Sequence, residues 1–167
     1  MEHRAEKLLE RLGVDNVPVP VEKIAKALGA KVRFSPLDDE LSGFIFIKEG
    51  VPIIGVNSLH HPNRQRFTIA HEIAHLQLHR EYITNAVHVD KNFSESILKR
   101  DGSSASGTER LEIEANQFAA ALLMPASILV DRFDQSPIDI EDEDSLKEWA
   151  AEFNVSKSAL QYRIRNL

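Results

Sequence analysis

The chain has 167 residues with 26 acidic and 20 basic side chains, a formal net charge of −6 and no cysteine. This length suits one domain with a proper core, with room for a small terminal appendage. Without cysteine there are no disulfides and no thiolate ligands, so a metal would have to be bound by histidine, aspartate or glutamate. The net negative charge disfavours a broad nucleic-acid surface, which requires clustered lysine and arginine.

The sequence gives no sign of a membrane or secretory segment. No apolar stretch approaches the roughly 20 residues that span a bilayer. The first seven residues are charged and amphipathic, and they lack the apolar core of a secretory signal. We therefore expect a cytoplasmic protein with no membrane partner.

The first part of the chain predicts two short helices followed by strands. Residues 2–12 form an amphipathic pattern that stops at Gly13, and residues 21–28 form a second helical pattern capped by Gly29. Residues 31–34 alternate as a strand does.

A β-hairpin is predicted next, from residues 43–47 and 51–57. Pro52 has no N–H to donate, so the second strand should either lie at a sheet edge or begin with Pro52. An edge strand there, leading into the next helix, could pair with an extended peptide substrate by β-augmentation.

The rest of the chain predicts helices. Residues 64–79 are apolar over most of the helix circumference, which indicates a buried helix. A glycine- and serine-rich loop covers 101–107, and a second long helix runs from Glu109 to Met124, before Pro125. Shorter helices are expected at 126–134, 145–153 and 157–166, the last capped by Ser156. The predicted class is α+β, a small sheet beside several helices.

We divide the chain into residues 1–135 and a C-terminal helical segment, 136–167, packed on or next to them. Residues 144–165 have a helix-turn-helix rhythm, which suggests DNA binding. The alternative is a pair of helices that closes the domain or contacts a partner. We favour the alternative, because few basic residues are available there for phosphate contacts.

The strongest chemical signal is His71-Glu72-Ile73-Ala74-His75, an H-E-x-x-H pattern within the buried helix. Residues i and i+4 lie on one helix face about 6 Å apart, so both imidazoles can bind one ion. Glu72 lies about 100° around the helix. It can flank the metal without ligating it, which suits a general base acting on water. Unpaired polar groups are costly in an apolar helix, and this favours their use.

A catalytic zinc site needs a third protein ligand and an open position. Glu112 is the best candidate, because it shares a helix face with Ala115, Asn116 and Ala119, and small alanines allow close helix approach. Asn116 could then orient a ligand histidine. Glu114 points elsewhere and is the second choice. Two imidazoles and a carboxylate suit zinc best among divalent ions.

Other histidines are weaker candidates. His79 continues the same helix face but lies about 12 Å along the axis from His71, so we interpret it as a histidine at the helix C-terminus. One of four further side chains could stabilise an oxyanion, and the sequence does not say which: His60, His61, His88 or Tyr82.

The segments 66–76 and 112–125 together resemble the ImmA/IrrE family of bacterial and phage metallopeptidases. The resemblance covers roughly residues 5–130. It implies a compact zincin-like fold, zinc ligands at His71, His75 and Glu112, and catalysis by Glu72.

Family members typically act in the cytoplasm on helix-turn-helix repressors, which they cleave to relieve repression. The resemblance therefore implies a zinc endopeptidase with a separate repressor as its substrate. A zinc-stabilised sensor that engages a repressor without cutting it is the alternative, and a DNA-binding regulator using residues 145–166 is the third hypothesis.

Overall fold

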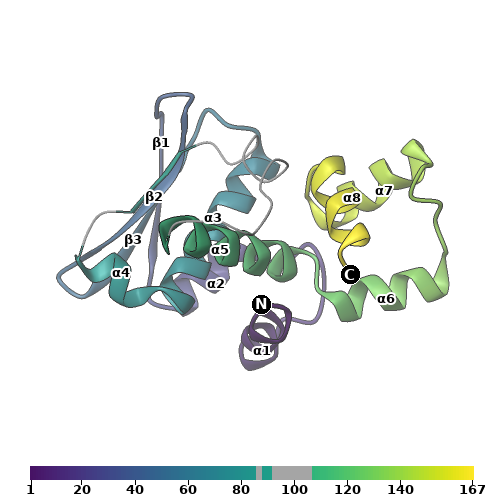
Figure 1. Cartoon of the computed structure of the whole chain (residues 1–167), viewed down its shortest axis with the longest axis horizontal. Helices are drawn as coiled ribbons and strands as arrows, with labels where there is room; N and C mark the ends of the chain where they lie inside the picture. Colours follow the sequence, from purple (N-terminus) through teal and green to yellow (C-terminus); the bar gives the residue numbers. More distant parts are fainter. Residues whose placement is uncertain (86–87, 92–106) are drawn as a thin grey trace.

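The computed structural model describes residues 1–85, 88–91 and 107–167, and it places a four-stranded sheet beside a group of helices (Figure 1). The predicted α+β class is confirmed. The elements in chain order are α1 (Glu2–Leu12), α2 (Val21–Ala27), β1 (Lys31–Ser35), β2 (Leu41–Lys48), β3 (Val51–Asn57), α3 (Pro62–Leu78), α4 (Arg80–Asn85), β4 (His88–Lys91), α5 (Gly107–Leu123), α6 (Ala126–Gln135), α7 (Glu143–Phe153) and α8 (Lys157–Arg165).

The sheet has the order β1-β3-β2-β4, so β3 is a central strand. The hairpin of β2 and β3 is antiparallel as predicted, but β1 pairs with β3 in parallel on its other side. The predicted edge position of residues 51–57 was therefore wrong, and peptide pairing along this strand is excluded because both of its sides are occupied. The other expectation, a position of Pro52 at the start of the strand, is met to within one residue, because β3 begins at Val51. Pairing with β1 begins only at Ile53, one residue after the proline.

Local capping accounts for several helix boundaries. α3 begins at Pro62, earlier than predicted, because His61 caps it by accepting from the Asn63 N–H and proline is tolerated in the first turn. α7 begins at Glu143, where Asp142 accepts from the Asp144 N–H. The Ser156 cap of α8 is confirmed by its hydrogen bond from the Ala159 N–H. Residues 101–106 of the predicted loop lie outside the described residues, and Gly107 already belongs to α5.

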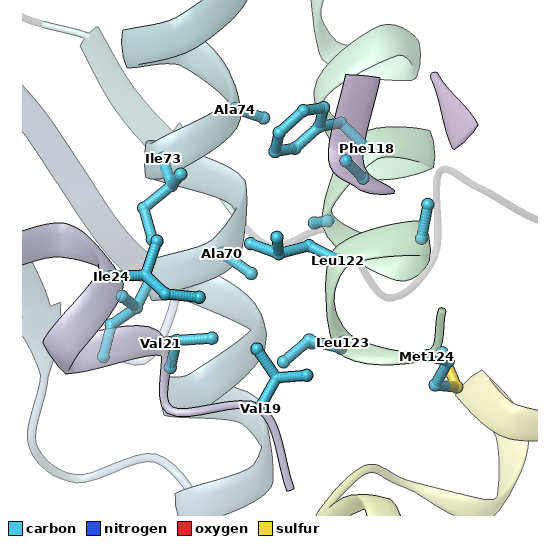
Figure 2. Close-up of a cluster of buried hydrophobic side chains, with 14 of the residues drawn as sticks. Val19, Val21, Ile24, Ala70, Ile73, Ala74, Phe118, Leu122, Leu123 and Met124 are labelled. Atoms are coloured by element: carbon cyan, nitrogen blue, oxygen red, sulfur yellow. The ribbon is translucent and has the colours of Figure 1, made fainter. Parts of the chain in front are cut away.

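The core lies around α3, which contacts β2 and β3 on one side and α5 on another. The inner face of the sheet contributes fully buried Ile45, Ile54 and Val56. Figure 2 shows Ala70 and Ala74 of α3 facing Phe118 and Leu122 of α5. The alanines explain how the two helices approach closely, since small side chains keep little volume between the backbones.

Gly43 of β2 fixes how α3 lies on the sheet. A methyl group there would lie 2.5 Å from Thr68 Cγ2 of α3 and 2.5 Å from the carbonyl oxygen of Gly55. Any side chain would therefore push α3 away from the hairpin or displace the backbone of β3.

The C-terminal helices pack on the rest of the chain through an apolar cluster and polar contacts. Trp149, Phe153 and Leu160 are buried. The turn between α7 and α8 lies against α3: Asn63 donates to the Val155 carbonyl at 3.2 Å, and Arg66 donates to the Asn154 carbonyl at 3.3 Å.

α8 is also anchored to the end of α5. Arg163 is buried and donates to the carbonyl of Met124 at 3.0 Å, and it pairs with Glu2 of α1. These contacts join helices from both ends of the chain around the C-terminus of α5.

Within the described ranges no single helix is long and apolar enough to cross a membrane; only the bent pair α5 and α6 meets the length and composition criteria, and it does so jointly.

We expect Gly43→Ala to lower the free energy of unfolding by about 1–3 kcal/mol, because overpacking forces α3 off the sheet. Urea denaturation followed by circular dichroism measures the change. Gly107→Ala is the matched control, since nothing lies within 4 Å of the added methyl group, and it should change stability by less than about 1 kcal/mol. Equal stability of the two variants would contradict the close approach.

Candidate metal centre

The H-E-x-x-H segment lies in the most buried part of α3. His71, Glu72 and His75 are all 0% exposed, and their neighbours Ile69, Ala70, Ile73 and Ala74 are buried as well. Burying three ionisable side chains in apolar surroundings is costly unless each one is bound to something. The apolar residues around the motif predicted this buried position from the sequence.

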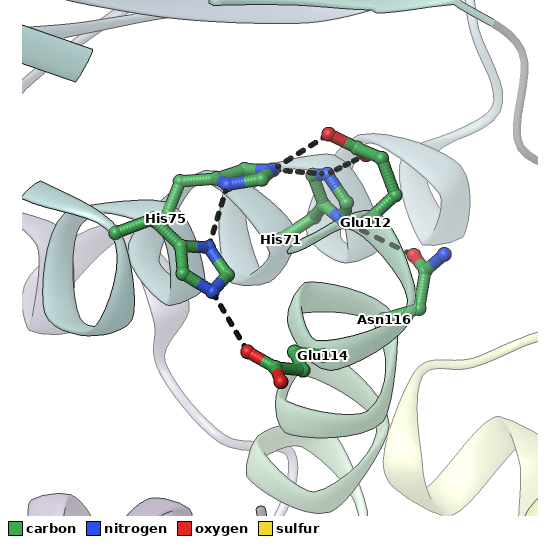
Figure 3. A network of polar contacts seen from close by, with 6 residues as sticks. His71, His75, Glu112, Glu114 and Asn116 are labelled. Atoms are coloured by element: carbon green, nitrogen blue, oxygen red, sulfur yellow. Dashed lines mark hydrogen bonds and ion pairs between the residues drawn. The ribbon is translucent and has the colours of Figure 1, made fainter. Parts of the chain in front are cut away.

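α5 brings a carboxylate to the two imidazoles (Figure 3). The Nε2 atoms of His71 and His75 lie 2.9 Å apart. Glu112 places one carboxylate oxygen 3.3 Å from His71 Nε2 and the other 3.4 Å from His75 Nε2. These three residues form a group of potential ligands within 4.8 Å of one another.

These distances fit a shared ion. Zinc ligands at 2.0–2.1 Å in a tetrahedral arrangement lie roughly 3.3 Å from one another. A single proton on one imidazole could bridge only one of the three contacts, because each hydrogen bond uses one donor. A cation at the centre would satisfy all three electron-rich atoms together. The donor set of two imidazoles and a carboxylate matches the ligands that zinc uses in catalytic sites.

The other nitrogen of each imidazole is also held. His71 Nδ1 lies 3.0 Å from Asn116 Oδ1, so α5 orients this ring one turn after Glu112. The predicted contact of Asn116 with one of the two motif histidines is therefore present. An amide oxygen accepts only, so it favours the ring with its proton on Nδ1 and the lone pair on Nε2, facing His75 and Glu112.

Glu114 lies outside the triad. Its carboxylate accepts a hydrogen bond from His79 Nε2 at 3.1 Å and another from Arg110 Nε at 3.1 Å. The hydrogen bond from His79 is the main reason that the pKa of Glu114 lies below its ordinary value, and Arg110 adds to the effect. Glu114 is thus a carboxylate that binds the side chain of His79, and Glu112 is the acid that meets His71 and His75.

His79 has a larger part in the site than the sequence suggested. It follows α3 as its C-terminal cap, but its side chain is only 5% exposed and its Nδ1 lies 3.1 Å from Nδ1 of His75. The i+4 spacing of His79 from His75 is the sequence signal for this contact, whereas its distance from His71 indicated only that it is not a metal ligand.

The other candidates are placed as follows. His60 Nε2 lies 3.2 Å from the Asn57 amide, His61 caps α3, Tyr82 is exposed on α4 and His88 belongs to β4. None of them is among the residues of the triad.

Residues 25–165 match the family model described as the IrrE N-terminal-like domain, Peptidase_M78. The chain belongs to this family, and its mixed α+β structure agrees with the zincin-like fold of the family.

A solved structure described as a Mycobacterium tuberculosis transcriptional regulator has the same fold, with a TM-score of 0.62 and 18% sequence identity. The similarity covers 95% of this chain and 44% of the regulator, so this chain spans less than half of that protein. No curated protein matches this chain.

Glu112 and Glu114 on α5 give a direct test of the ligand set. Glu112→Gln should weaken zinc binding more than about 100-fold, because it removes the anionic member of the triad. Glu114→Gln should weaken it less than about tenfold, because glutamine still offers an oxygen to His79. Competition with a chelating dye measures both affinities. Equal losses, or a larger loss for Glu114→Gln, would contradict the assignment.

Proposed function

We propose that the chain is a zinc-dependent endopeptidase, with His71, His75 and Glu112 as metal ligands and Glu72 as the general base. The observation that carries this proposal is the meeting of two buried imidazoles on α3 with a carboxylate on α5, at separations of 2.9 to 3.4 Å. Membership in a peptidase family supports the reaction class.

Zinc bound at this place would act as a Lewis acid that polarises a scissile carbonyl and makes water a better nucleophile at neutral pH. Glu72, fully buried next to His71 in the chain, would take the proton from the attacking water and return it to the leaving amine. Asn116 would keep the ring of His71 in place during this step.

The substrate that we propose is a helix-turn-helix repressor, cleaved to relieve repression. The family resemblance supports this choice, together with the shared fold of a protein described as a transcriptional regulator. The proposed division of the chain assigns 1–135 to the metallopeptidase domain and 136–167 to a helical segment that packs on it through α3 and the end of α5.

We do not assign DNA binding to α8, because its basic residues already have acidic or backbone partners. Lys157 pairs with Glu143 at 3.0 Å and Arg165 with Glu141 at 3.3 Å. Arg163 is buried and bound to the Met124 carbonyl. Phosphate binding would have to break these contacts.

Glu72→Gln should retain zinc at wild-type stoichiometry and slow cleavage by at least about 100-fold, because a general base contributes roughly 10²–10⁴-fold. The assay incubates the purified chain with a helix-turn-helix repressor and identifies the products by mass spectrometry.

The same variant separates the enzyme from a zinc-stabilised sensor. Loss of cleavage together with loss of derepression in cells is the result expected for an enzyme. Derepression that persists in Glu72→Gln would favour the sensor, since binding without cutting would then be sufficient.

DNA binding is tested through its salt dependence. A protein with 6–10 phosphate contacts loses roughly 10³–10⁵-fold in affinity between 50 and 200 mM salt. We expect fluorescence anisotropy with a labelled duplex to show no such binding by the intact chain. A steep salt dependence that Lys157→Ala and Arg165→Ala together reduce would restore α8 as a DNA-binding helix.

A further inference from the structure

Behind the metal ligand His75 lies a chain of three side chains that the peptidase mechanism does not use. His75 Nδ1 lies 3.1 Å from His79 Nδ1, His79 Nε2 lies 3.1 Å from Glu114 Oε2, and Glu114 Oε1 accepts from Arg110 Nε at 3.1 Å. This series of hydrogen-bonded side chains starts at the buried centre, where His75 is 0% exposed, and ends at the surface, where the Arg110 side chain is 79% exposed. Figure 3 shows the series of contacts from His75 to Glu114.

The positions of the protons along this chain follow from the lone pairs. An ion at the triad takes the lone pair of His75 Nε2, so the proton of that neutral ring is on Nδ1. This Nδ1–H points at His79 Nδ1, which must then be an acceptor. The proton of His79 is consequently on Nε2, and it points at the carboxylate of Glu114.

The opposite arrangement is penalised at its outer end. With its proton on Nδ1, His79 would donate to His75 and force the His75 proton onto Nε2, where the ion has to bind. His79 Nε2 would then present a lone pair to an ionised carboxylate 3.1 Å away, and two acceptors at that distance repel each other. Glu114 therefore selects the proton position of His79, and His79 selects that of His75.

The two ligand histidines are held in different ways. The partner of His71 is the neutral side-chain oxygen of Asn116. The partner of His75 is an imidazole backed by a carboxylate, and Arg110 on the preceding turn of α5 fixes the orientation of that carboxylate. The hydrogen bond between His79 and the charged carboxylate of Glu114 is stronger than one between two neutral groups.

We propose that His79 and Glu114 are positioning residues of the metal centre, which hold His75 with its proton on Nδ1 and its Nε2 lone pair directed at the ion. This inference rests on the proposed metal site, and it adds residues that do not touch the ion. It predicts that metal affinity depends on an acceptor atom at the position of His79 Nδ1.

Two substitutions at residue 79 separate hydrogen bonding from packing. His79→Leu removes the acceptor, and His79→Asn keeps an oxygen at the same number of bonds from Cα as Nδ1. Zinc affinity of the purified full chain, measured by chelator competition, should fall roughly 10–100-fold in His79→Leu, the range typical for outer partners of metal ligands. His79→Asn should recover most of this loss.

The outcomes are decisive when the two variants have equal stability without metal, which urea denaturation checks. Equal losses of affinity in His79→Leu and His79→Asn would reduce His79 to a packing residue and overturn the proposal. Wild-type affinity in both variants would overturn it as well.

A spectroscopic measurement tests the role of Glu114. In the zinc-loaded wild type, imidazole ¹⁵N shifts should show His79 protonated on Nε2 and unprotonated on Nδ1. In Glu114→Leu we expect a mixture of the two tautomers and a weaker affinity for zinc. A proton on His79 Nδ1 in the loaded wild type would overturn the proposal.

Neither readout depends on peptide cleavage, so the two proposals can fail separately. Zinc binding that follows the acceptor at residue 79, in a chain that cuts no peptide, would refute the peptidase and retain the positioning role. A competent peptidase whose metal affinity is insensitive to residue 79 would do the reverse.

Discussion

The candidate metal centre depends on the close packing of α3 against α5, because this contact brings the electron-rich atoms of His71, His75 and Glu112 together. Ala70 and Ala74 on one helix and Ala115 and Ala119 on the other are all fully buried. With larger residues at these positions the carboxylate of Glu112 would lie farther from the imidazoles. Two imidazole lone pairs and a carboxylate are all electron-rich and repel one another, so their arrangement favours a cation at the centre.

α5 supplies more than the third candidate ligand, Glu112. Glu112 and Asn116, one turn apart, meet the two histidines on one face, and Glu114 reaches His79. One helix thus holds the carboxylate of the triad and the hydrogen-bond partners of both rings, so a shift of α5 would disturb all of them together. Its C-terminal end is held by Arg163 of α8, which binds the carbonyl of Met124.

The C-terminal helices are therefore coupled to the centre through both of its helices. The turn at Asn154 and Val155 contacts the first turns of α3, and α8 contacts the end of α5. The family match extends to residue 165, which includes these helices. The segment with a helix-turn-helix rhythm in the sequence forms a pair of helices. Their apolar residues are buried, and their basic residues Lys157 and Arg165 form ion pairs within the same polypeptide.

The sequence by itself determined the helices other than α4, the hairpin and the two imidazoles on one face, because periodicity, capping and the i, i+4 spacing are local properties of the chain. It also ranked Glu112 above Glu114, from the face that the alanines share. Tertiary structure decided the central position of β3 and the connection of His79 to Glu114. Both depend on contacts between segments far apart in sequence: β1 adds to the free side of β3, and α5 brings a carboxylate to the end of α3. Local patterns carry no information about which distant segment arrives, so only the folded chain could settle these points.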